Sequence, residues 1–424
     1  ITDISVYVKF ELMDEPGTYL IAWTTTPWTL PGNVALAVGA DVEYVRAKKD
    51  NVSYIVAKEL AEKVLKEGYV VEKEFTGSTL IGKSYKPIFD YYNTDTLEHK
   101  ENAWKVYAGD FVTTDAGTGI VHIAPAFGED DLALGQKYSL PFIQHVGFDG
   151  IIKPEVTDFA GLSAKPKSTA DEKDAHQKTD IEVIKVLASK GVLFSKEKII
   201  HSYPHCWRCE TPLLNYATSS WFVKVTDLKD KMLALNEKVS WVPETIGSGR
   251  FGKWIEGARD WSVSRARYWG APLPIWRCEN KHEVCVGSLS ELGKLAGKDL
   301  SKLDPHRPFV DDIKFKCGEC EKEMNRVPEV IDGWYDSGAM PFAQWGYPHK
   351  PGSKEKFEAA YPADFICEAI DQTRGWFYTL MAVGTLVFDK SSYKSVLCLG
   401  HILDKDGRKM SKHLGNVLEP ISLM

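Results

Sequence analysis

Cysteine and histidine side chains at metal-binding spacing give the strongest chemical signal in this sequence. There are two C-x-x-C pairs and, between them, one C-x3-H-x2-C segment. Two thiolates separated by two residues can bind one tetrahedral zinc ion. We expect the second pair to combine with Cys278 and either Cys285 or His282, because these groups bracket one inserted segment, and the first pair then lacks two partners. The candidate zinc ligands are Cys206, Cys209, Cys278, His282, Cys285, Cys317 and Cys320.

A threonine-rich segment could bind a sugar edge or a reactive ester. Thr24, Thr25, Thr26 and Thr29 supply four hydroxyls within six residues, at the end of an expected strand and beside a proline-stiffened turn. Each hydroxyl can both donate and accept a hydrogen bond. The alternative is a β-rich segment whose threonines are merely exposed, with Thr24 and Thr26 on one face.

Acidic residues follow an apolar run that contains His122. The chain passes from this run through Ala-Pro-Ala-Phe-Gly into three consecutive acids that end at Asp131. A carboxylate placed there can hold an ammonium group. The alternative is that His122 is a satisfied core histidine and that the acids form a solvated turn or a helix start.

A glycine-opened loop carries three cations in five residues, from Arg408 to Lys412. Ammonium groups on such a loop can neutralise the charge of a triphosphate and of a departing pyrophosphate. The alternative is a solvated basic turn. A preceding βαβ pattern favours the phosphate-binding interpretation.

The elements that must position these groups fall into two regions with different patterns. Short β-rich runs alternate with turns over residues 18–75, around one helical pattern at Glu59–Glu67, and we expect this β-rich domain to extend to about residue 200. The polar stretch Ala164–Asp180 is expected to be an exposed loop. The expected strands are Tyr19–Trp23, Val34–Val38, Tyr44–Lys48, Tyr54–Ala57 and Tyr69–Phe75.

The last region has the pattern of a βαβ unit. Strands are expected at Ala363–Cys367 and Ser395–Leu399, with a helix at Gln372–Phe388 between them. Parallel sheets bind ligands beyond the carboxyl ends of their strands, so residues 368–372 and 400–401 should lie near a ligand. The apolar stripe expected to be buried on the helix is Trp376, Leu380, Val383 and Val387.

Composition excludes several classes of protein. The chain has 424 residues and a net charge of −7, so any nucleic-acid contact must come from local basic patches. Its longest apolar run is shorter than the ~20 residues that a membrane span needs. Eight cysteines are too few for a disulfide scaffold, and the close pairing of six of them indicates a metal site in a reducing compartment. We expect a cytoplasmic protein.

Several segments together resemble the class I aminoacyl-tRNA synthetases. K-M-S-K-H at 409–413 is similar to their K-M-S-K-S signature, and three further segments occur in the order expected for the isoleucyl, valyl and leucyl branch. A-W-T-T-T-P-W-T-L-P-G-N at 22–33 and G-T-G-I-V-H-I-A-P-A-F-G-E-D-D at 117–131 are most similar to the isoleucyl-tRNA synthetase branch. The three further segments are W-S-V-S-R-A-R-Y-W-G at 261–270, V-I-D-G-W-Y-D-S-G at 330–338 and E-A-I-D-Q-T-R-G-W-F at 368–377.

The resemblance implies two sites. In a hydrolytic editing pocket, Asp131 would bind the α-amino group of a misattached amino acid, His122 would narrow the side-chain space, and the threonines would hold the terminal adenosine and a water. In the synthetic site, Glu368, Asp371 and Gln372 would bind the aminoacyl-adenylate, with Trp334 and Trp376 lining the isoleucine pocket; core packing is the alternative for both tryptophans. The implied ATP-binding residues are Lys409, Ser411 and Lys412.

The implied fold is α/β, with a β-rich inserted editing domain and part of a Rossmann-type nucleotide fold that carries small zinc-binding insertions. We expect an editing domain at 1–200, a zinc knuckle and stem at 201–260, half of the catalytic fold at 261–277 and 329–424, and a zinc insertion at 278–328.

The implied function is ATP-dependent attachment of isoleucine to tRNA-Ile with editing of Val-tRNA-Ile, in a monomer that uses Zn2+, and ATP with Mg2+. The family's H-I-G-H segment is absent; H-V-G-F at His145–Phe148 imitates its first three positions but lacks the second histidine. Anticodon-binding helices are also absent, so we expect a central part of a longer enzyme, unable by itself to activate isoleucine. The alternative is a stand-alone zinc-containing tRNA-binding or trans-editing protein.

Overall fold

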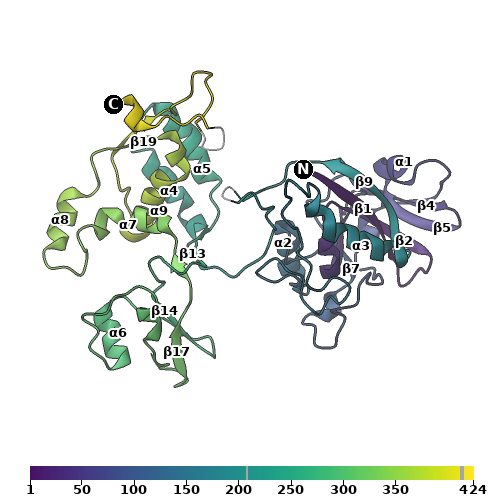
Figure 1. The fold of residues 1–424 in the computed structure, drawn as a ribbon, viewed down its shortest axis with the longest axis horizontal. Coiled ribbons are helices and arrows are strands. Elements are labelled where there is room, and N and C mark those ends of the chain that lie inside the picture. Colours follow the sequence, from purple (N-terminus) through teal and green to yellow (C-terminus); the bar gives the residue numbers. More distant parts are fainter. Residues whose placement is uncertain (207–208, 411–414) are drawn as a thin grey trace. The chain divides into compact units, whose positions relative to one another are not determined.

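The computed structural model describes residues 1–206, 209–410 and 415–424 (Figure 1). Within these residues the chain forms two compact units, Ile1–Thr218 and Ser219–Met424. Both units mix helices with strands, which confirms the α/β class. Among the helices of the described residues, none combines the length and apolarity needed to cross a bilayer.

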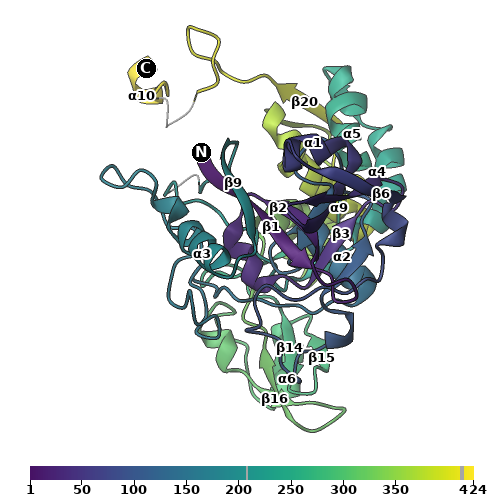
Figure 2. The same ribbon diagram turned by 90° about the vertical axis from the view of Figure 1, so that its right-hand side faces the viewer.

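The first unit is built on a nine-stranded mixed sheet. Its strand order is β6-β4-β5-β2-β8-β3-β7, and β1 pairs with both β2 and β9. Figure 2 shows β9 running beside β1, so segments almost 200 residues apart in sequence close one edge of this unit. The strands are β1 (Thr2–Glu11), β2 (Thr18–Thr24), β3 (Ala35–Val38), β4 (Glu43–Lys49), β5 (Val52–Ala57), β6 (Val70–Thr76), β7 (Lys105–Ala108), β8 (Ile120–Ile123) and β9 (Leu193–Ile200).

Short helices cover this sheet and connect its strands. The five strands expected between residues 18 and 75 are all present, and the expected helical pattern forms η2 and α1. Leu20, Leu36 and Val45 are among the apolar strand residues that fill the core. The helices are η1 (Pro27–Gly32), η2 (Lys58–Leu60), α1 (Ala61–Leu65), η3 (Gly77–Thr79), η4 (Lys100–Asn102), α2 (Glu129–Tyr138), η5 (Ala175–Gln177) and α3 (Lys178–Ser189).

The stretch Ala164–Asp180 is not simply an exposed loop, and that prediction was wrong at both ends. Lys165 is 3% exposed and Asp180 is fully buried. The Lys165 ammonium lies 2.9 Å from a carboxylate oxygen of Asp3 and 3.5 Å from one of Asp180. Burial of these charges is tolerated because they are paired, a relation between distant residues that composition does not reveal.

The second unit contains a three-stranded parallel sheet in the order β11-β20-β19, with α9 on the crossover. The expected βαβ unit is therefore present, with β20 at the expected residues. The expected single helix is divided: a 3₁₀ turn, η9, precedes α9, and Gly375 separates them. The elements are β11 (Ser240–Val242), β19 (Ile366–Ala369), η9 (Ile370–Arg374), α9 (Trp376–Phe388) and β20 (Ser395–Leu399).

Helix α9 is buried over most of its circumference, from Phe377 to Thr385. Leu380 and Val383 are buried as expected, but Val387 is 47% exposed, so the expected stripe is wrong at its C-terminal end. The helix ends at Phe388, and its last turn emerges from the core. Gly338 of α7 (Gly333–Ala343) permits close packing here, since a Cβ on it would lie 2.8 Å from the Thr379 carbonyl oxygen.

A separate four-stranded antiparallel sheet in the order β15-β14-β17-β16 forms the cysteine-rich part of the second unit. Its strands are β14 (Ile275–Cys278), β15 (Glu283–Cys285), β16 (Phe315–Lys316) and β17 (Glu323–Arg326). The remaining elements of the unit are β10 (Phe222–Val223), η6 (Val225–Leu228), α4 (Lys229–Asn236), the π-helix η7 (Ile246–Phe251), α5 (Gly252–Glu256), β12 (Trp261–Ser262), β13 (Ser264–Arg265), α6 (Leu289–Ala296), η8 (Phe309–Asp312), β18 (Val330–Ile331), α8 (Ser353–Ala360) and α10 (Pro420–Leu423).

Candidate functional site

The threonine-rich segment forms a compact turn at the end of β2. The Thr24 hydroxyl accepts from the Thr26 backbone N–H at 3.1 Å and lies 3.2 Å from the Thr26 hydroxyl. The Thr29 hydroxyl donates to the Thr26 carbonyl oxygen at 2.8 Å, within η1. Thr24 and Thr29 are buried, whereas Thr25 and Thr26 are half-buried. The hydroxyls therefore form one ordered chain that reaches from the interior towards the surface.

His122 extends this chain from the neighbouring strand β8. Its Nε2 lies 2.9 Å from the Thr29 hydroxyl, and its Nδ1 lies 3.0 Å from the side-chain nitrogen of Asn33. The Asn33 side-chain oxygen accepts from the Tyr85 hydroxyl at 2.8 Å, and its nitrogen also donates to the Ala35 carbonyl. This orients the amide so that it donates to Nδ1, and Nε2 must then carry the proton donated to Thr29.

Burial keeps the His122 ring neutral. Desolvation, with a smaller contribution from the nearby His145, lowers the pKa of His122 to about 3. A group with that pKa neither takes up nor releases a proton near neutral pH. His122 can therefore form a wall and donate a fixed hydrogen bond, but it is poorly suited to general acid–base catalysis.

Asp131 lies in the first turn of α2, immediately after β8 and its connecting loop. One carboxylate oxygen accepts from the Ala124 backbone N–H at 2.7 Å. Burial raises the pKa of Asp131 to about 6 despite this hydrogen bond. A Cβ on Gly128 would lie 2.2 Å from the other oxygen, so a side chain at position 128 would displace the Asp131 carboxylate. In the described part of the chain, no hydrogen bond joins Asp131 to the threonines or to His122.

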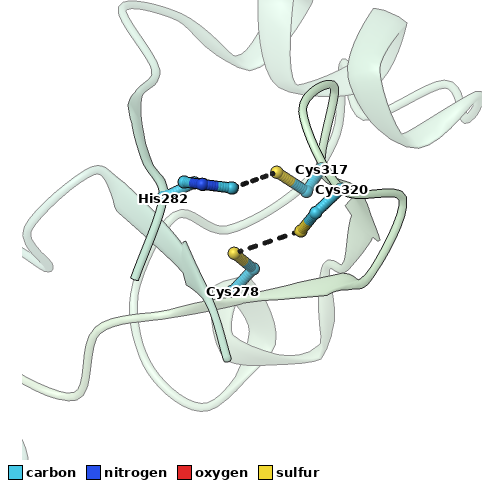
Figure 3. Close-up of side chains that lie close together, drawn as sticks. All are labelled: Cys278, His282, Cys317 and Cys320. Atoms are coloured by element: carbon cyan, nitrogen blue, oxygen red, sulfur yellow. Dashed lines mark hydrogen bonds between the residues drawn. The ribbon is translucent and has the colours of Figure 1, made fainter. Parts of the chain in front are cut away.

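The structure brings four predicted metal ligands together in the second unit (Figure 3). The ligand atoms of Cys278, His282, Cys317 and Cys320 all lie within 4.8 Å of one another. Cys278 ends β14 and His282 follows the tight turn into β15, while the other two cysteines occupy the turn between β16 and β17. Two hairpin turns thus bring their ligands to one point.

The local electrostatics favours a thiolate at this cluster. The backbone N–H of Glu319 donates to the Cys317 sulfur at 3.4 Å and is the main cause that lowers the pKa of the Cys317 thiol to about 6. Metals bind the thiolate and not the thiol. Cys285, the alternative to His282, lies outside the group because β15 places it opposite Ile275, away from the turn that holds Cys278.

The other cysteine pair, Cys206 and Cys209, lies in the first unit. The Cys206 backbone N–H donates to the Thr211 carbonyl at 2.9 Å, and the Cys209 sulfur lies 3.2 Å from the Thr211 hydroxyl. Among the described residues, no third metal-binding side chain joins this pair. The pair therefore offers two ligands at most within the chain that the structure describes.

The expected adenylate-binding residues follow β19, where the βαβ pattern places them. The Gln372 side-chain oxygen accepts from the Trp376 backbone N–H at 2.8 Å, and its nitrogen donates to Asp371 at 3.2 Å. A Cβ on Gly375 would lie 2.6 Å from that Gln372 oxygen and 3.0 Å from the ring of Trp334. The Gln372 side chain, the Trp376 backbone and the Trp334 ring therefore meet around Gly375, with Trp334 45% exposed.

The remaining predicted residues of this region are open to solvent. Glu368 and Asp371 are exposed near the carboxyl end of β19, and Lys409 is exposed in a short bridge with Leu403. Arg408 is already paired with Asp404 and Asp406. Ser411 and Lys412 lie outside the described residues.

Sequence reasoning missed Asn33 and Tyr85, which set the orientation of His122. Asn33 directly follows Pro31 and Gly32, a pattern that predicts only a turn. Tyr85 belongs to no recognised motif. A buried asparagine that precedes a strand could have suggested a structural hydrogen bond, but its partner on another strand leaves no local signal.

Comparison with known proteins gives a consistent assignment. Residues 155–424 match the family model described as tRNA synthetases class I (I, L, M and V). An isoleucine–tRNA ligase of Streptomyces avermitilis is 51% identical over 430 aligned residues, which cover 100% of this chain and 39% of that protein. One of Clostridium acetobutylicum is 48% identical, again over 100% of this chain and 39% of that protein.

A solved structure titled "The crystal structure of GlLeuRS-CP1" aligns with a TM-score of 0.33 and 16% identity, covering 47% of this chain and 100% of that one. The chain spans about 39% of the length of the curated relatives named above. More than half of it matches the family model. The chain therefore belongs to the class I tRNA synthetases of the isoleucine, leucine, methionine and valine group.

Proposed function

We propose that this chain is part of an isoleucine–tRNA ligase and that its first unit hydrolyses valine from mischarged tRNA-Ile. The observation that carries the ligase proposal is 51% identity to an isoleucine–tRNA ligase along the whole chain. The observation that supports editing is the hydrogen-bonded chain of Thr24, Thr26, Thr29 and His122.

A hydrolytic site has a physical purpose in such an enzyme. Isoleucine and valine differ by one methylene, and a hydrophobic pocket gains only about 1–3 kcal/mol from that difference. A second pocket that admits valine and excludes isoleucine supplies the remaining fidelity. His122, held rigidly from both ring nitrogens, is suited to set the size of such a pocket.

In the proposed reaction a positioned water attacks the ester that joins valine to the terminal adenosine. Thr25 and Thr26, the half-buried members of the turn, would donate to the ester or the ribose. Asp131 would bind the α-ammonium and so orient the ester. Because His122 stays neutral, its fixed donation to Thr29 would hold the turn without a change of charge during the reaction.

The second unit would contribute to synthesis in the longer protein. Glu368, Asp371 and Gln372 would bind the aminoacyl-adenylate, and Trp334 and Trp376 would line the isoleucine pocket. Lys409, Ser411 and Lys412 would contact the phosphates of ATP, which is bound with Mg2+ as the substrate. The contact of Trp334 with the segment that contains Gln372 and Trp376 supports this grouping.

We infer that the four-ligand cluster holds a structural zinc ion. Three thiols and one imidazole match the ligands that zinc prefers in closed tetrahedral sites. Bound zinc would cross-link the two hairpin turns of a small sheet whose own core is limited. Cys206 and Cys209 would bind a second ion only with ligands from outside the described residues.

The partners in this proposal are tRNA-Ile, isoleucine and ATP, for a monomer in the cytoplasm. The proposed division is an editing domain at 1–200, a knuckle and stem at 201–260, catalytic segments at 261–277 and 329–424, and a zinc insertion at 278–328. A stand-alone tRNA-binding or trans-editing protein would share the first unit's activity but would not be part of a ligase.

A deacylation assay tests the editing proposal directly. The purified chain is incubated with Val-tRNA-Ile and with Ile-tRNA-Ile, and release of each amino acid is measured. We expect rapid release of valine and slow release of isoleucine. A chain that is folded by circular dichroism and binds tRNA, yet releases neither amino acid, would contradict the proposal.

A further inference from the structure

The peptide groups on both sides of Trp28 are held by two buried side chains from other elements. The Trp28 backbone N–H donates to a carboxylate oxygen of Asp180 at 3.0 Å. The Trp28 carbonyl oxygen lies 2.9 Å from His145 Nε2, which must be the donor because a carbonyl only accepts. All three residues are almost completely buried. These contacts join parts of the sequence more than 100 residues apart.

Trp28 lies inside the threonine turn, between Thr26 and Thr29. The peptide group that follows it donates from the Thr29 backbone N–H to the Thr26 carbonyl oxygen at 3.0 Å. The same Thr26 carbonyl accepts the Thr29 hydroxyl. A shift of the Trp28 backbone would therefore move the hydroxyls that are proposed to face the ester.

The Asp180 carboxylate is also held by a charged group, through the oxygen that does not contact Trp28. Its second carboxylate oxygen lies 3.5 Å from the Lys165 ammonium, which also contacts Asp3 at 2.9 Å. Asp3 is in turn 2.9 Å from His201 Nε2. Among the described residues, no hydrogen bond or ion pair joins Asp3 to the threonine turn, although Asp3 is as buried as Asp180 and shares its lysine.

His145 is fixed by packing. Its ring meets the Phe127 ring edge-on, with 4.7 Å between centroids. Its Nδ1 is buried and has no hydrogen-bond partner in the described structure. A Cβ on Gly32 would lie 2.7 Å from that nitrogen, so the glycine at the end of η1 leaves room for the ring. The Trp28 carbonyl is thus the one acceptor that the ring engages among the described residues.

We propose that Asp180 and His145 are positioning residues for the deacylation reaction, acting through the backbone of Trp28 to hold the threonine turn. This inference rests on the proposed editing function. Neither residue belongs to the threonine segment or to the segment that contains Asp131. Their effect should fall on kcat, since they orient groups at the ester and do not bind the tRNA.

The competing explanation is that Asp180 serves only as a partner for the buried Lys165. Two double variants separate the explanations, because both remove the ion pair and differ only in the acceptor for Trp28. Lys165→Met/Asp180→Asn retains an oxygen that can accept from the Trp28 N–H. Lys165→Met/Asp180→Leu has none. In both variants Asp3 keeps its contact with His201.

We expect the Asn double variant to keep kcat for Val-tRNA-Ile within about 3-fold of the wild type. The Leu double variant should lose about 10- to 100-fold in kcat with an unchanged KM, because a small misplacement of reacting groups slows the reaction by that much. Asp3→Asn is the matched single control and should keep kcat. Equal kcat in the two double variants, each folded by circular dichroism and binding tRNA, would overturn the role of Asp180.

Two single variants test the role of His145: one side chain can donate a hydrogen bond to the Trp28 carbonyl and the other cannot. His145→Gln can present an amide N–H near the position of Nε2, whereas His145→Leu cannot. We expect the Gln variant to retain at least ten times the kcat of the Leu variant. Equal rates in folded variants would overturn the role of His145. If the wild type itself fails to release valine, the proposed editing function is wrong. If the wild type releases valine and the variants keep the same kcat, only the positioning roles of Asp180 and His145 are wrong.

Discussion

At the scale of single residues, the proposed role of Asp131 requires an ionised carboxylate, whereas its buried environment favours the protonated form. Its pKa is raised to about 6 by burial, so the carboxylate in the free protein is ionised above pH 6 and protonated below it. Only the ionised form binds an ammonium group strongly. The editing proposal therefore makes the rate depend on pH in a range where His122, with a pKa of about 3, does not titrate.

We predict that Asp131→Ala and Asp131→Asn lose valine hydrolysis at pH 7.5, by about 10- to 100-fold in kcat/KM, because a charge-assisted contact contributes about 1.5–3 kcal/mol. Wild-type kcat/KM should decrease as the pH falls through about 6. The measurement is a pH profile of Val-tRNA-Ile deacylation from pH 5 to 8. Full activity of either variant at pH 7.5 would remove Asp131 from the site.

The raised pKa of Asp131 also means that ionisation of this carboxyl lowers the stability of the first unit. The folded state holds the Asp131 proton more tightly than the unfolded state, whose carboxyl titrates near 3.8, so stability is lost as the pH rises from about 3.8 to about 6 and the penalty is fully present above pH 6. Asp131→Asn, which can still accept from Ala124, should stabilise the first unit by about 1–2 kcal/mol at pH 7.5. The gain should vanish at pH 3.5. Urea denaturation at both values measures it.

We predict that His122→Ala releases isoleucine from Ile-tRNA-Ile while valine release is retained, because the pocket loses its wall. Discrimination between the two esters should fall by about 10-fold or more. His122→Gln restores bulk and a donor, and should restore discrimination. The assay compares both esters for each variant. Continued rejection of isoleucine by His122→Ala would show that another group sets the pocket size.

The sequence indicated the threonines, His122 and Asp131 but not what holds them. Motif similarity identifies residues that are close together in the chain. Asn33, Asp180 and Lys165 act through partners on other elements, and the composition around Asp180 suggested solvent exposure. Pairing between distant charges is decided by the fold and leaves no pattern in the local sequence.

At the scale of elements, the two hairpin turns of the cysteine-rich sheet depend on their shared cluster. We predict that Cys320→Ser removes the bound zinc and lowers the melting temperature of this sheet, because three ligands bind the ion much less tightly than four. Cys285→Ser is the matched control, since Cys285 lies outside the cluster. Elemental analysis should find at least one zinc per wild-type chain and per Cys285→Ser chain. A folded wild type without metal would contradict the assignment.

The break between η9 and α9 offers a second test at this scale. An Ala side chain at Gly375 would collide with Gln372 and with the Trp334 ring, whereas Gly333, in the first turn of α7, faces open space. We predict that Gly375→Ala destabilises the second unit by about 1–3 kcal/mol and that Gly333→Ala is neutral or slightly stabilising. Denaturant unfolding measures both. Equal stability of the two variants would show that Trp334 moves aside freely.

Element types were more predictable than their boundaries. The sequence pattern predicted five of the nine strands of the first unit and the βαβ unit, because burial of one face is a local property of the sequence. The division of the expected helix at Gly375 and the exposure of Val387 depend on where Trp334 and the edge of the core lie. Those positions are set by elements that are distant in sequence.

At the scale of the whole molecule, tRNA binding depends on where the basic residues lie and not on the net charge. The chain carries a net charge of −7, so binding of a polyanion depends on stretches in which basic residues predominate, such as residues 250–267, where five basic residues outnumber two acidic ones. The basic residues are Arg250, Lys253, Arg259, Arg265 and Arg267. Arg265 is already paired with Asp332 at 2.7 Å. We predict that tRNA binding weakens with salt, with a log–log slope no steeper than about −5. Filter binding between 50 and 300 mM KCl measures the slope, and a salt-independent affinity would contradict the prediction.

The strand order of the parallel sheet has a consequence for the making of this protein. β20 lies between β11 and β19, so the central strand is the last of the three to leave the ribosome. Ser240 of β11 pairs with Ser395 of β20 and cannot do so until that residue has been synthesised. At about 5–20 residues per second that interval is on the order of ten seconds or more, during which the edge of β11 that pairs with β20 has no partner strand. The matching edge of β19 lacks its partner only for the last part of that interval. The first unit can close as soon as β9 has emerged. Nascent chains stalled after β19 should therefore carry a folded first unit and a second unit that depends on chaperones.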